Sequence, residues 1–164
     1  RHGDSCADHR SQRKCHPLAA YMVHVSRMGQ MYGIKTVYLA TDDAKVVKEA
    51  RAGYGKDFKF ATAPVDRQFY ENKRRIESRM QKMSGKSLMR AGMEAVVDIE
   101  LMSRCHAFVG TFSTNLGRIA FELMAARRGY VPPFASLDIS WCAGFDKKNK
   151  PTYSSSGKMV PFDC

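Results

Sequence analysis

Apolar positions along this chain follow two spacings that alternate from the amino end to about Arg128. Apolar side chains recur every three or four residues over 18–28, which predicts an amphipathic helix that ends within Gly29–Gly33. The run K-T-V-Y-L-A at 35–40 is apolar and rich in β-strand formers, which predicts a strand. No element is predicted beyond Pro132-Pro133, where the period is lost. The same two patterns predict further helices over 44–52, 87–105 and a stretch that includes 119–124, and further strands over 58–61 and 107–109.

The alternation of strands and helices is typical of an α/β fold. Short apolar strands joined by helices predict a parallel sheet with right-handed crossovers. The chain has no internal repeat and no pattern that indicates a second domain. It starts at Arg1, directly in motif-like sequence, so we expect it to be a fragment of a longer protein.

Polar residues gather at three places where a predicted strand ends. The clusters are Arg1–Asp4, Thr41–Asp43 and Gly110–Asn115. Because the carboxyl ends of parallel strands lie on one edge of a sheet, we expect the three clusters to share that edge. The last cluster leads into a helix, and hydroxyls and backbone N–H groups at a helix N-terminus bind phosphates. The simpler alternative is that Ser113 or Thr114 only caps the helix.

The chain is strongly basic, with 27 Lys and Arg against 16 Asp and Glu and a formal net charge of +11. This excess favours an anionic partner, which can be a nucleotide diphosphate, a nucleic acid or an acidic glycan. Much of the charge lies over 73–90, where the alternative is a solvated helix face. No apolar run approaches the roughly 18 residues that cross a membrane, and the start has no signal-peptide pattern.

The cysteines leave the cellular compartment open. Cys6 and Cys15 bracket a short polar loop, and a disulfide or two free thiols suit them better than a zinc site. Their spacing with His9 and His16 matches no standard zinc motif. Ser84–Ser87 resembles the end of a P-loop but lacks the earlier glycine, and no G-x-G-x-x-G occurs, so neither nucleotide-binding motif is supported.

The polar clusters belong to a longer series of motifs. In order and spacing the series resembles the C-terminal, donor-binding half of the α-1,6-fucosyltransferases that act on N-glycan cores, and rhizobial chitin-oligosaccharide fucosyltransferases share its blocks. The resemblance covers residues 1–145, with 66–86 as an insertion and 146–164 as a C-terminal tail. The blocks are R-H-G-D at 1–4, H-P with Y-M-V-H-V at 16–25, Y-L-A-T-D-D at 38–43, D-I with M-S at 98–103, and T-F-S-T with Arg118 and Glu122 at 111–122.

The resemblance implies both a fold and a set of partners. The fold would be a Rossmann-like domain, a parallel sheet flanked by helices, that forms the C-terminal half of a B-type glycosyltransferase fold. The partners would be GDP-fucose, a glycan acceptor of N-glycan or chitin type, and an N-terminal domain of the same protein that this chain lacks. No metal or other cofactor, no nucleic acid and no membrane contact by this fragment is expected. For a eukaryotic parent the resemblance implies the Golgi lumen.

The donor-binding residues follow from the resemblance position by position. Arg1 would hold the β-phosphate of the donor, and Asp98 would contact the guanine. The Ser113-Thr114 loop would contact the diphosphate, with Asn115 adjacent. Asp42 and Asp43 would organise the site. The chemistry agrees, since a carboxylate can accept both N–H donors of a guanine edge.

The catalytic residues implied by the resemblance are Arg1, Asp4, which would fix the basic loop, and Asp8, the candidate base. Inverting transfer builds negative charge on the leaving GDP, and without a metal a guanidinium and helix amides must stabilise it. The family usually carries R-R-x-D-K where this chain has R-H-G-D-S at 1–5. The leading prediction is a fucosyltransferase fragment that is inactive alone. The alternatives are a GDP-sugar-binding module that has lost turnover through Ser5 and the altered loop, and a basic nucleic-acid-binding α/β domain.

Overall fold

A computed structural model describes residues 16–65, 67 and 83–141 of the chain. Within these ranges helices and strands alternate, which confirms the predicted α/β class. No helix there is long and apolar enough to cross a membrane. The helices are α1 (Leu18–Tyr32), α2 (Ala44–Tyr54), α4 (Gly85–Ser103) and α5 (Asn115–Arg128), and the strands are β1 (Thr36–Tyr38), β2 (Lys59–Ala61), β3 (Phe108–Gly110) and β4 (Phe134–Ser136).

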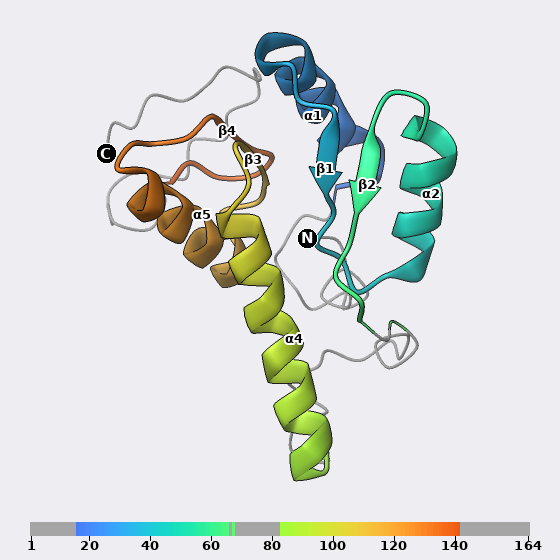
Figure 1. Ribbon diagram of the computed structural model, residues 1–164, viewed down its shortest axis with the longest axis vertical. Helices are drawn as coiled ribbons and strands as arrows, with labels where there is room; N and C mark the ends of the chain where they lie inside the picture. The colour runs from blue at the N-terminus through green and yellow to red at the C-terminus, as the bar shows by residue number, and fades with distance from the viewer. Residues whose placement is uncertain (1–15, 66, 68–82, 142–164) are drawn as a thin grey trace.

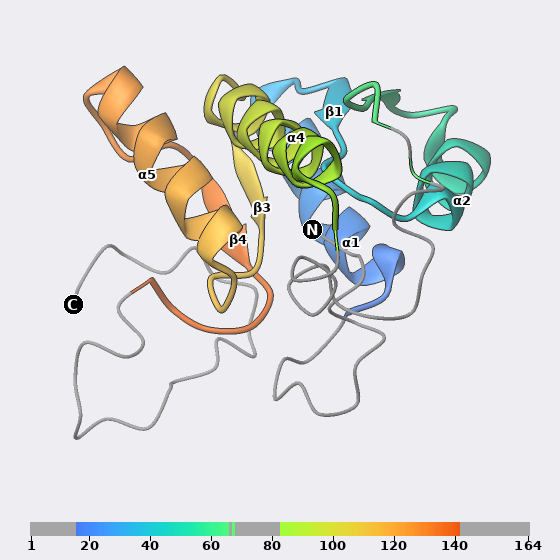
Figure 2. The same cartoon turned by 90° about the horizontal axis from the view of Figure 1, so that it is seen from below.

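The strands form two parallel pairs, which confirms the predicted parallel pairing. β1 pairs with β2, with Val37 opposite Phe60, and β3 pairs with β4, with Val109 opposite Ala135. Within the described ranges the two pairs are separate sheets and not one continuous sheet. Helices α1 and α2 contact each other on one side of the strands, and α4 and α5 contact each other on the other side (Figures 1 and 2).

Each strand pair has its own hydrophobic core. Leu18 and Met22 of α1 pack with Val46 and Ala50 of α2 and with Phe58, against β1 and β2. The second core is aromatic and surrounds β3 and β4. Its buried members are Phe108, Phe112, Phe121 and Met124, and the side chains packed against them are Cys105, Phe134, Ile139 and Trp141.

Phe112 lies at the centre of the aromatic core. Its ring is fully buried and stacks on Phe108, with 5.6 Å between the ring centroids. The ring of Phe121 lies 5.2 Å away, and the edge contact with Trp141 is also 5.2 Å. Removing a buried ring of this kind costs about 3–5 kcal/mol, so Phe112 ties the loop after β3 to the core.

Helices α1 and α2 end within the glycine-containing stretches that the sequence predicted. The sequence predicted that α1 ends within Gly29–Gly33 and that Gly53–Gly55 stops α2, and the structure confirms both, since Gly33 caps α1 after Tyr32 and Gly55 caps α2 after Tyr54. Helix α2 runs two residues beyond the predicted 44–52. A single glycine inside a helix costs only about 1 kcal/mol, which packing offsets. A Cβ on Gly29 would lie 3.0 Å from the ring of Phe58, so glycine allows this close contact. The true stop is Gly33, whose φ of 67° is left-handed.

Strand β4 was not predicted, because no element was expected beyond Pro132-Pro133. The strand has three residues and a burial pattern without alternation, so its sequence carries little periodic signal. Its pairing with β3 makes it a strand. The predicted insertion at 66–86 falls mostly outside the described residues, and its last two residues, Gly85 and Lys86, begin α4. The predicted tail at 146–164 lies outside the described residues altogether.

Candidate functional site

The loop after β1 is built on two aspartates and a threonine. The backbone N–H of Asp43 donates to Oγ1 of Thr41 at 3.1 Å, and Oδ1 of Asp43 accepts from the N–H of Lys45 at 2.8 Å. Asp43 is therefore the N-cap of α2, a position that aspartate favours because its carboxylate suits the positive end of a helix. Thr41 and Asp42 are buried, with 3% and 6% of their surface exposed, and Asp43 is partly exposed.

The loop after β3 is held by a carboxylate from beyond β4. Asp138 accepts hydrogen bonds from the N–H of Phe112 at 2.9 Å and from the N–H of Ser113 at 3.3 Å. Nε of Arg118 donates to the carbonyl of Phe112 at 2.5 Å. We predicted free backbone N–H groups in this loop, and that prediction is wrong for Phe112 and Ser113, because a buried carboxylate already uses their N–H groups.

Thr114 closes the same loop as a helix cap. Its hydroxyl donates to the carbonyl of Thr111 at 3.0 Å and accepts from the N–H of Gly117 at 3.2 Å. The simpler alternative from the sequence, a capping residue, is therefore confirmed for Thr114. In the described part of the chain, the loop keeps the Ser113 hydroxyl and the first-turn N–H groups of Asn115 and Leu116 available to a ligand.

Asp98 lies on α4 and meets the end of β1. The hydroxyl of Tyr38 donates to Oδ1 of Asp98 at 2.5 Å. Burial raises the pKa of Tyr38, and the hydrogen bond to Asp98 and the charge of that carboxylate raise it further. Because Tyr38 is the last residue of β1, Asp98 lies at the same end of the strand as the Thr41–Asp43 loop.

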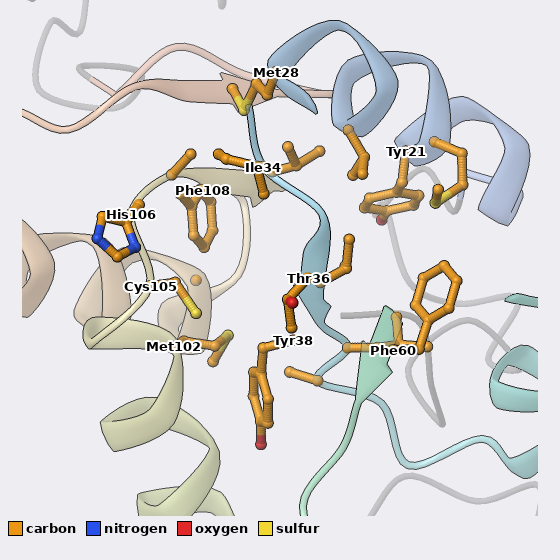
Figure 3. A pocket seen from close by; sticks show the side chains of 18 of the residues that line it. Tyr21, Met28, Ile34, Thr36, Tyr38, Phe60, Met102, Cys105, His106 and Phe108 are labelled. Carbon is orange, nitrogen blue, oxygen red and sulfur yellow. The ribbon is translucent and has the colours of Figure 1, made fainter. Parts of the chain in front are cut away.

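An apolar cavity of about 340 Å³ lies between the two strand pairs. Figure 3 shows Tyr21 and Met28 of α1, Tyr38 of β1 and Phe108 of β3 around it. Leu39 and Thr111, the residues that directly follow β1 and β3, both line this cavity. Of the predicted donor-binding residues in the described ranges, Thr114 lines this cavity, and the lining includes none of Asp42, Asp43, Asp98, Ser113 and Asn115.

Three predicted catalytic residues, Arg1, Asp4 and Asp8, lie outside the described residues, as do Cys6 and Cys15. Across 16–65, 67 and 83–141, no three His, Cys, Asp or Glu side chains come close enough to hold a metal ion. Burial raises the pKa of the Cys105 thiol, which lines the cavity.

Sequence reasoning missed Tyr38, Arg118 and Asp138 as residues that build the site. Arg118 was noted only as part of a motif. Asp138 lies shortly after β4, as Asp42 lies shortly after β1. Recognising β4 from the sequence would therefore have added a fourth polar position to the three clusters predicted at strand ends. Tyr38 had no such signal, because its position in a strand pattern predicts only packing.

Comparison with known proteins identifies a family and a relative that match most of this chain. Residues 9–139 match the family described as "Alpha-(1,6)-fucosyltransferase N- and catalytic domains". The chain is also similar to a Drosophila melanogaster protein named alpha-(1,6)-fucosyltransferase, with 28% identity over 120 residues. The match covers 70% of this chain and 17% of the fly protein, so the chain spans about a sixth of that relative's length.

Proposed function

Since this chain belongs to the alpha-(1,6)-fucosyltransferase family, we propose that it is the donor-binding part of an enzyme that transfers fucose from GDP-fucose to a glycan. The observation that carries the proposal is the position of Asp98. Its carboxylate accepts a hydrogen bond from Tyr38, the last residue of β1, and the carboxyl ends of strands form the edge where α/β domains bind nucleotides.

Asp98 has the chemistry to hold a guanine. The N1–H and the exocyclic amino group of guanine point in the same direction and suit the two oxygens of a carboxylate. The hydroxyl of Tyr38 uses one acceptor site on Oδ1, and a carboxylate offers about four such sites. Tyr38 therefore orients the Asp98 carboxylate and occupies one of these sites. Uracil has one N–H on its corresponding edge and leaves the second oxygen unmatched.

The diphosphate is proposed to lie over the N-terminus of α5. The helix dipole is positive at this end, and the Ser113 hydroxyl with the N–H groups of Asn115 and Leu116 can donate to phosphate oxygens. Asp138 uses the preceding two N–H groups, so it limits how many donors face the ligand. Asp138 also rigidifies the loop, which fixes the donors before the charge develops.

The catalytic step is proposed to be inverting and independent of metal. As the bond to fucose breaks, negative charge grows on the β-phosphate, and the guanidinium of Arg1 would stabilise it through a charge-assisted pair of hydrogen bonds. Asp4 would fix the basic loop that carries Arg1. Asp8 is the candidate base for the acceptor hydroxyl. Asp42 and Asp43 shape the neighbouring loop and do not take part in the chemistry.

A GDP-sugar-binding module without turnover is the second candidate. The observation that favours it is Ser5, which stands where the family usually has lysine, together with the absence of the second arginine. Both candidates bind GDP, and only the first transfers fucose.

The test is fucose transfer by the whole protein that contains this chain, with an N-glycan acceptor. Arg1→Ala is expected to lower kcat by about 10²–10³ with little change in donor affinity, which is the usual effect of deleting one such stabiliser. Arg1→Lys should recover little, because an ammonium cannot form the paired contact. A chelator should leave the rate unchanged. GDP binding without transfer by the whole wild-type protein would favour the module, and normal turnover in Arg1→Ala would remove Arg1 from the mechanism.

A further inference from the structure

The apolar cavity lies along the edges of two strands and not on their faces. Its lining includes the consecutive residues 36–40 of the β1 segment and 107–109 of the β3 segment. Successive side chains of a strand point to opposite faces of a sheet. A cavity lined by consecutive residues therefore meets both faces of each strand, and this is possible only at a strand edge.

The backbone hydrogen bonds show which edge of β1 faces the cavity. The carbonyl of Lys35 accepts from the N–H of Lys59, and the N–H of Leu39 donates to the carbonyl of Ala61, both at 2.8 Å. Odd-numbered residues of β1 thus direct their backbone groups to β2. Backbone groups alternate along a parallel strand, so those of Thr36 and Tyr38 point away from β2, toward the cavity.

The same alternation holds for β3. The N–H of Phe108 donates to the carbonyl of Pro133 at 2.9 Å, and the carbonyl of Gly110 accepts from the N–H of Leu137 at 2.9 Å. The backbone groups of Val109 therefore point away from β4, again toward the cavity. Two polar strand edges face each other across an apolar space.

The two remaining sides of the cavity are covered by helices. Tyr21, Met22 and Met28 of α1 line one side. Met102 at the end of α4 lines the other (Figure 3). Met124 of α5 also belongs to the lining. Apolar cover on both faces, with backbone donors and acceptors on both edges, is the environment of an internal strand in a parallel sheet.

We propose that this slot holds an extended apolar strand of the same polypeptide, inserted between β1 and β3 and parallel to both. The strand would join the two pairs into one sheet, in the order β2, β1, inserted strand, β3, β4. It would come from the segment that leads into residues 1–15. Helix α1 covers the slot and continues directly into β1, and a right-handed crossover through α1 requires the preceding strand to lie beside β1 on the side away from β2.

The rest of this sequence offers no such strand. Cys6, Ala7 and Cys15 are the only apolar residues of 1–15, and 68–82 is rich in lysine and arginine. The best run in 142–164 is Met159–Phe162, which includes Pro161 and so lacks a backbone donor. The fly relative has nearly six times the length that this chain matches, so chain for such a strand exists in the family.

Hydrogen exchange on chains extended at Arg1 tests the proposal. One extension is an alternating Val and Ile segment of about five residues, the usual length of a strand. Its control has the same length with proline at every second position, which keeps the apolar character but removes alternate N–H donors. The N–H groups of Tyr38 and Val109 are the probes. The N–H of Leu39, already bonded to Ala61, is the internal control for folding.

We expect exchange at Tyr38 and Val109 to slow by roughly a hundredfold or more with the Val and Ile extension, with no such change in the proline control. Protection of Leu39 only in the Val and Ile chain would also support the proposal, because the strand would then be needed for folding. Unchanged exchange at Tyr38 and Val109 would overturn it. Equal protection by both extensions would overturn the backbone pairing, and protection that appears only in a dimer would overturn insertion within one chain. The inference is independent of the proposed function, because no readout involves GDP.

Discussion

The hydroxyl of Tyr38 donates to the carboxylate of Asp98, joining the last residue of β1 to the C-terminal half of α4 across 60 positions of sequence. This contact fixes the carboxylate that we assign to the guanine. Tyr38→Phe should lower the free energy of unfolding by about 1–3 kcal/mol, since a half-buried carboxylate loses a donor. Tyr54→Phe is the matched control, because the Tyr54 hydroxyl has no hydrogen bond among the described residues, and it should change stability by less than about 0.5 kcal/mol. Urea denaturation of both variants gives the comparison, and equal midpoints would contradict the role of the contact.

The raised pKa of Tyr38 predicts a pH dependence. Folding keeps this phenol protonated to a higher pH than its ordinary value of about 10. The associated stability is therefore complete below about pH 10 and is lost as pH rises above it. Burial, with the charge of Asp138 second, raises the pKa of Tyr21 to about 12, which adds in the same direction.

Unfolding free energies measured from about pH 8 to about pH 11 test this prediction, because the range spans the ordinary tyrosine pKa. Stability should fall more steeply above about pH 10 in the wild type than in Tyr38→Phe. The variant is the control, since lysines and other tyrosines titrate equally in both. Parallel curves would show that Tyr38 ionises as easily in the folded chain as in the unfolded one.

Asp138 is expected to be the strongest polar determinant of the loop after β3. Asp138→Ala would leave the N–H groups of Phe112 and Ser113 without their acceptor and should cost about 2–4 kcal/mol. Asp138→Asn keeps one acceptor oxygen and should cost about half as much. Asp57→Ala, an exposed aspartate, should have almost no effect. Thermal unfolding ranks the three, and a mild effect of Asp138→Ala would mean that water replaces the carboxylate.

Two helical glycines give a matched pair of substitutions. A Cβ on Gly117 would lie 2.7 Å from the carbonyl oxygen of Thr111 and 2.8 Å from Oγ1 of Thr114, so Gly117→Ala must displace the loop. We expect a loss of about 1–3 kcal/mol. A Cβ on Gly92 meets nothing within 4 Å, so Gly92→Ala in α4 should gain about 0.5–1 kcal/mol from helix propensity. Stability changes of the same sign in both variants would contradict this difference.

Local patterns predicted most of the elements but not the contacts that finish the site. Asp43 as a helix cap was predictable because its hydrogen bond spans only two positions. The contact between Asp138 and Phe112 spans 26 positions, and no local pattern encodes it. The strand β4 was missed for the same reason, since β3 supplies its hydrogen bonds. The ends of α1 and α2 were predictable as well, because the glycines that cap them, Gly33 and Gly55, lie within the predicted stretches.

The family resemblance was predictable from motif order, and the family match confirms it. The sequence did not predict which polar side chains of the site can reach a ligand and which are used inside the loop. Ser113 and Thr114 have the same kind of side chain and adjoin each other, yet the Thr114 hydroxyl is committed to Thr111 and Gly117. Only the three-dimensional arrangement separates a residue that shapes the loop from one that can reach a ligand.

Calorimetric titration of the chain with GDP and with UDP tests the central claim, that Asp98 holds the guanine of the donor. The chain should bind GDP roughly tenfold or more tightly than UDP, because an unmatched carboxylate costs about 1–3 kcal/mol. Asp98→Asn should remove most of this preference, while Asp57→Asn should leave it unchanged. Equal affinity for GDP and UDP in the folded wild-type chain, or an undiminished preference in Asp98→Asn, would contradict the account.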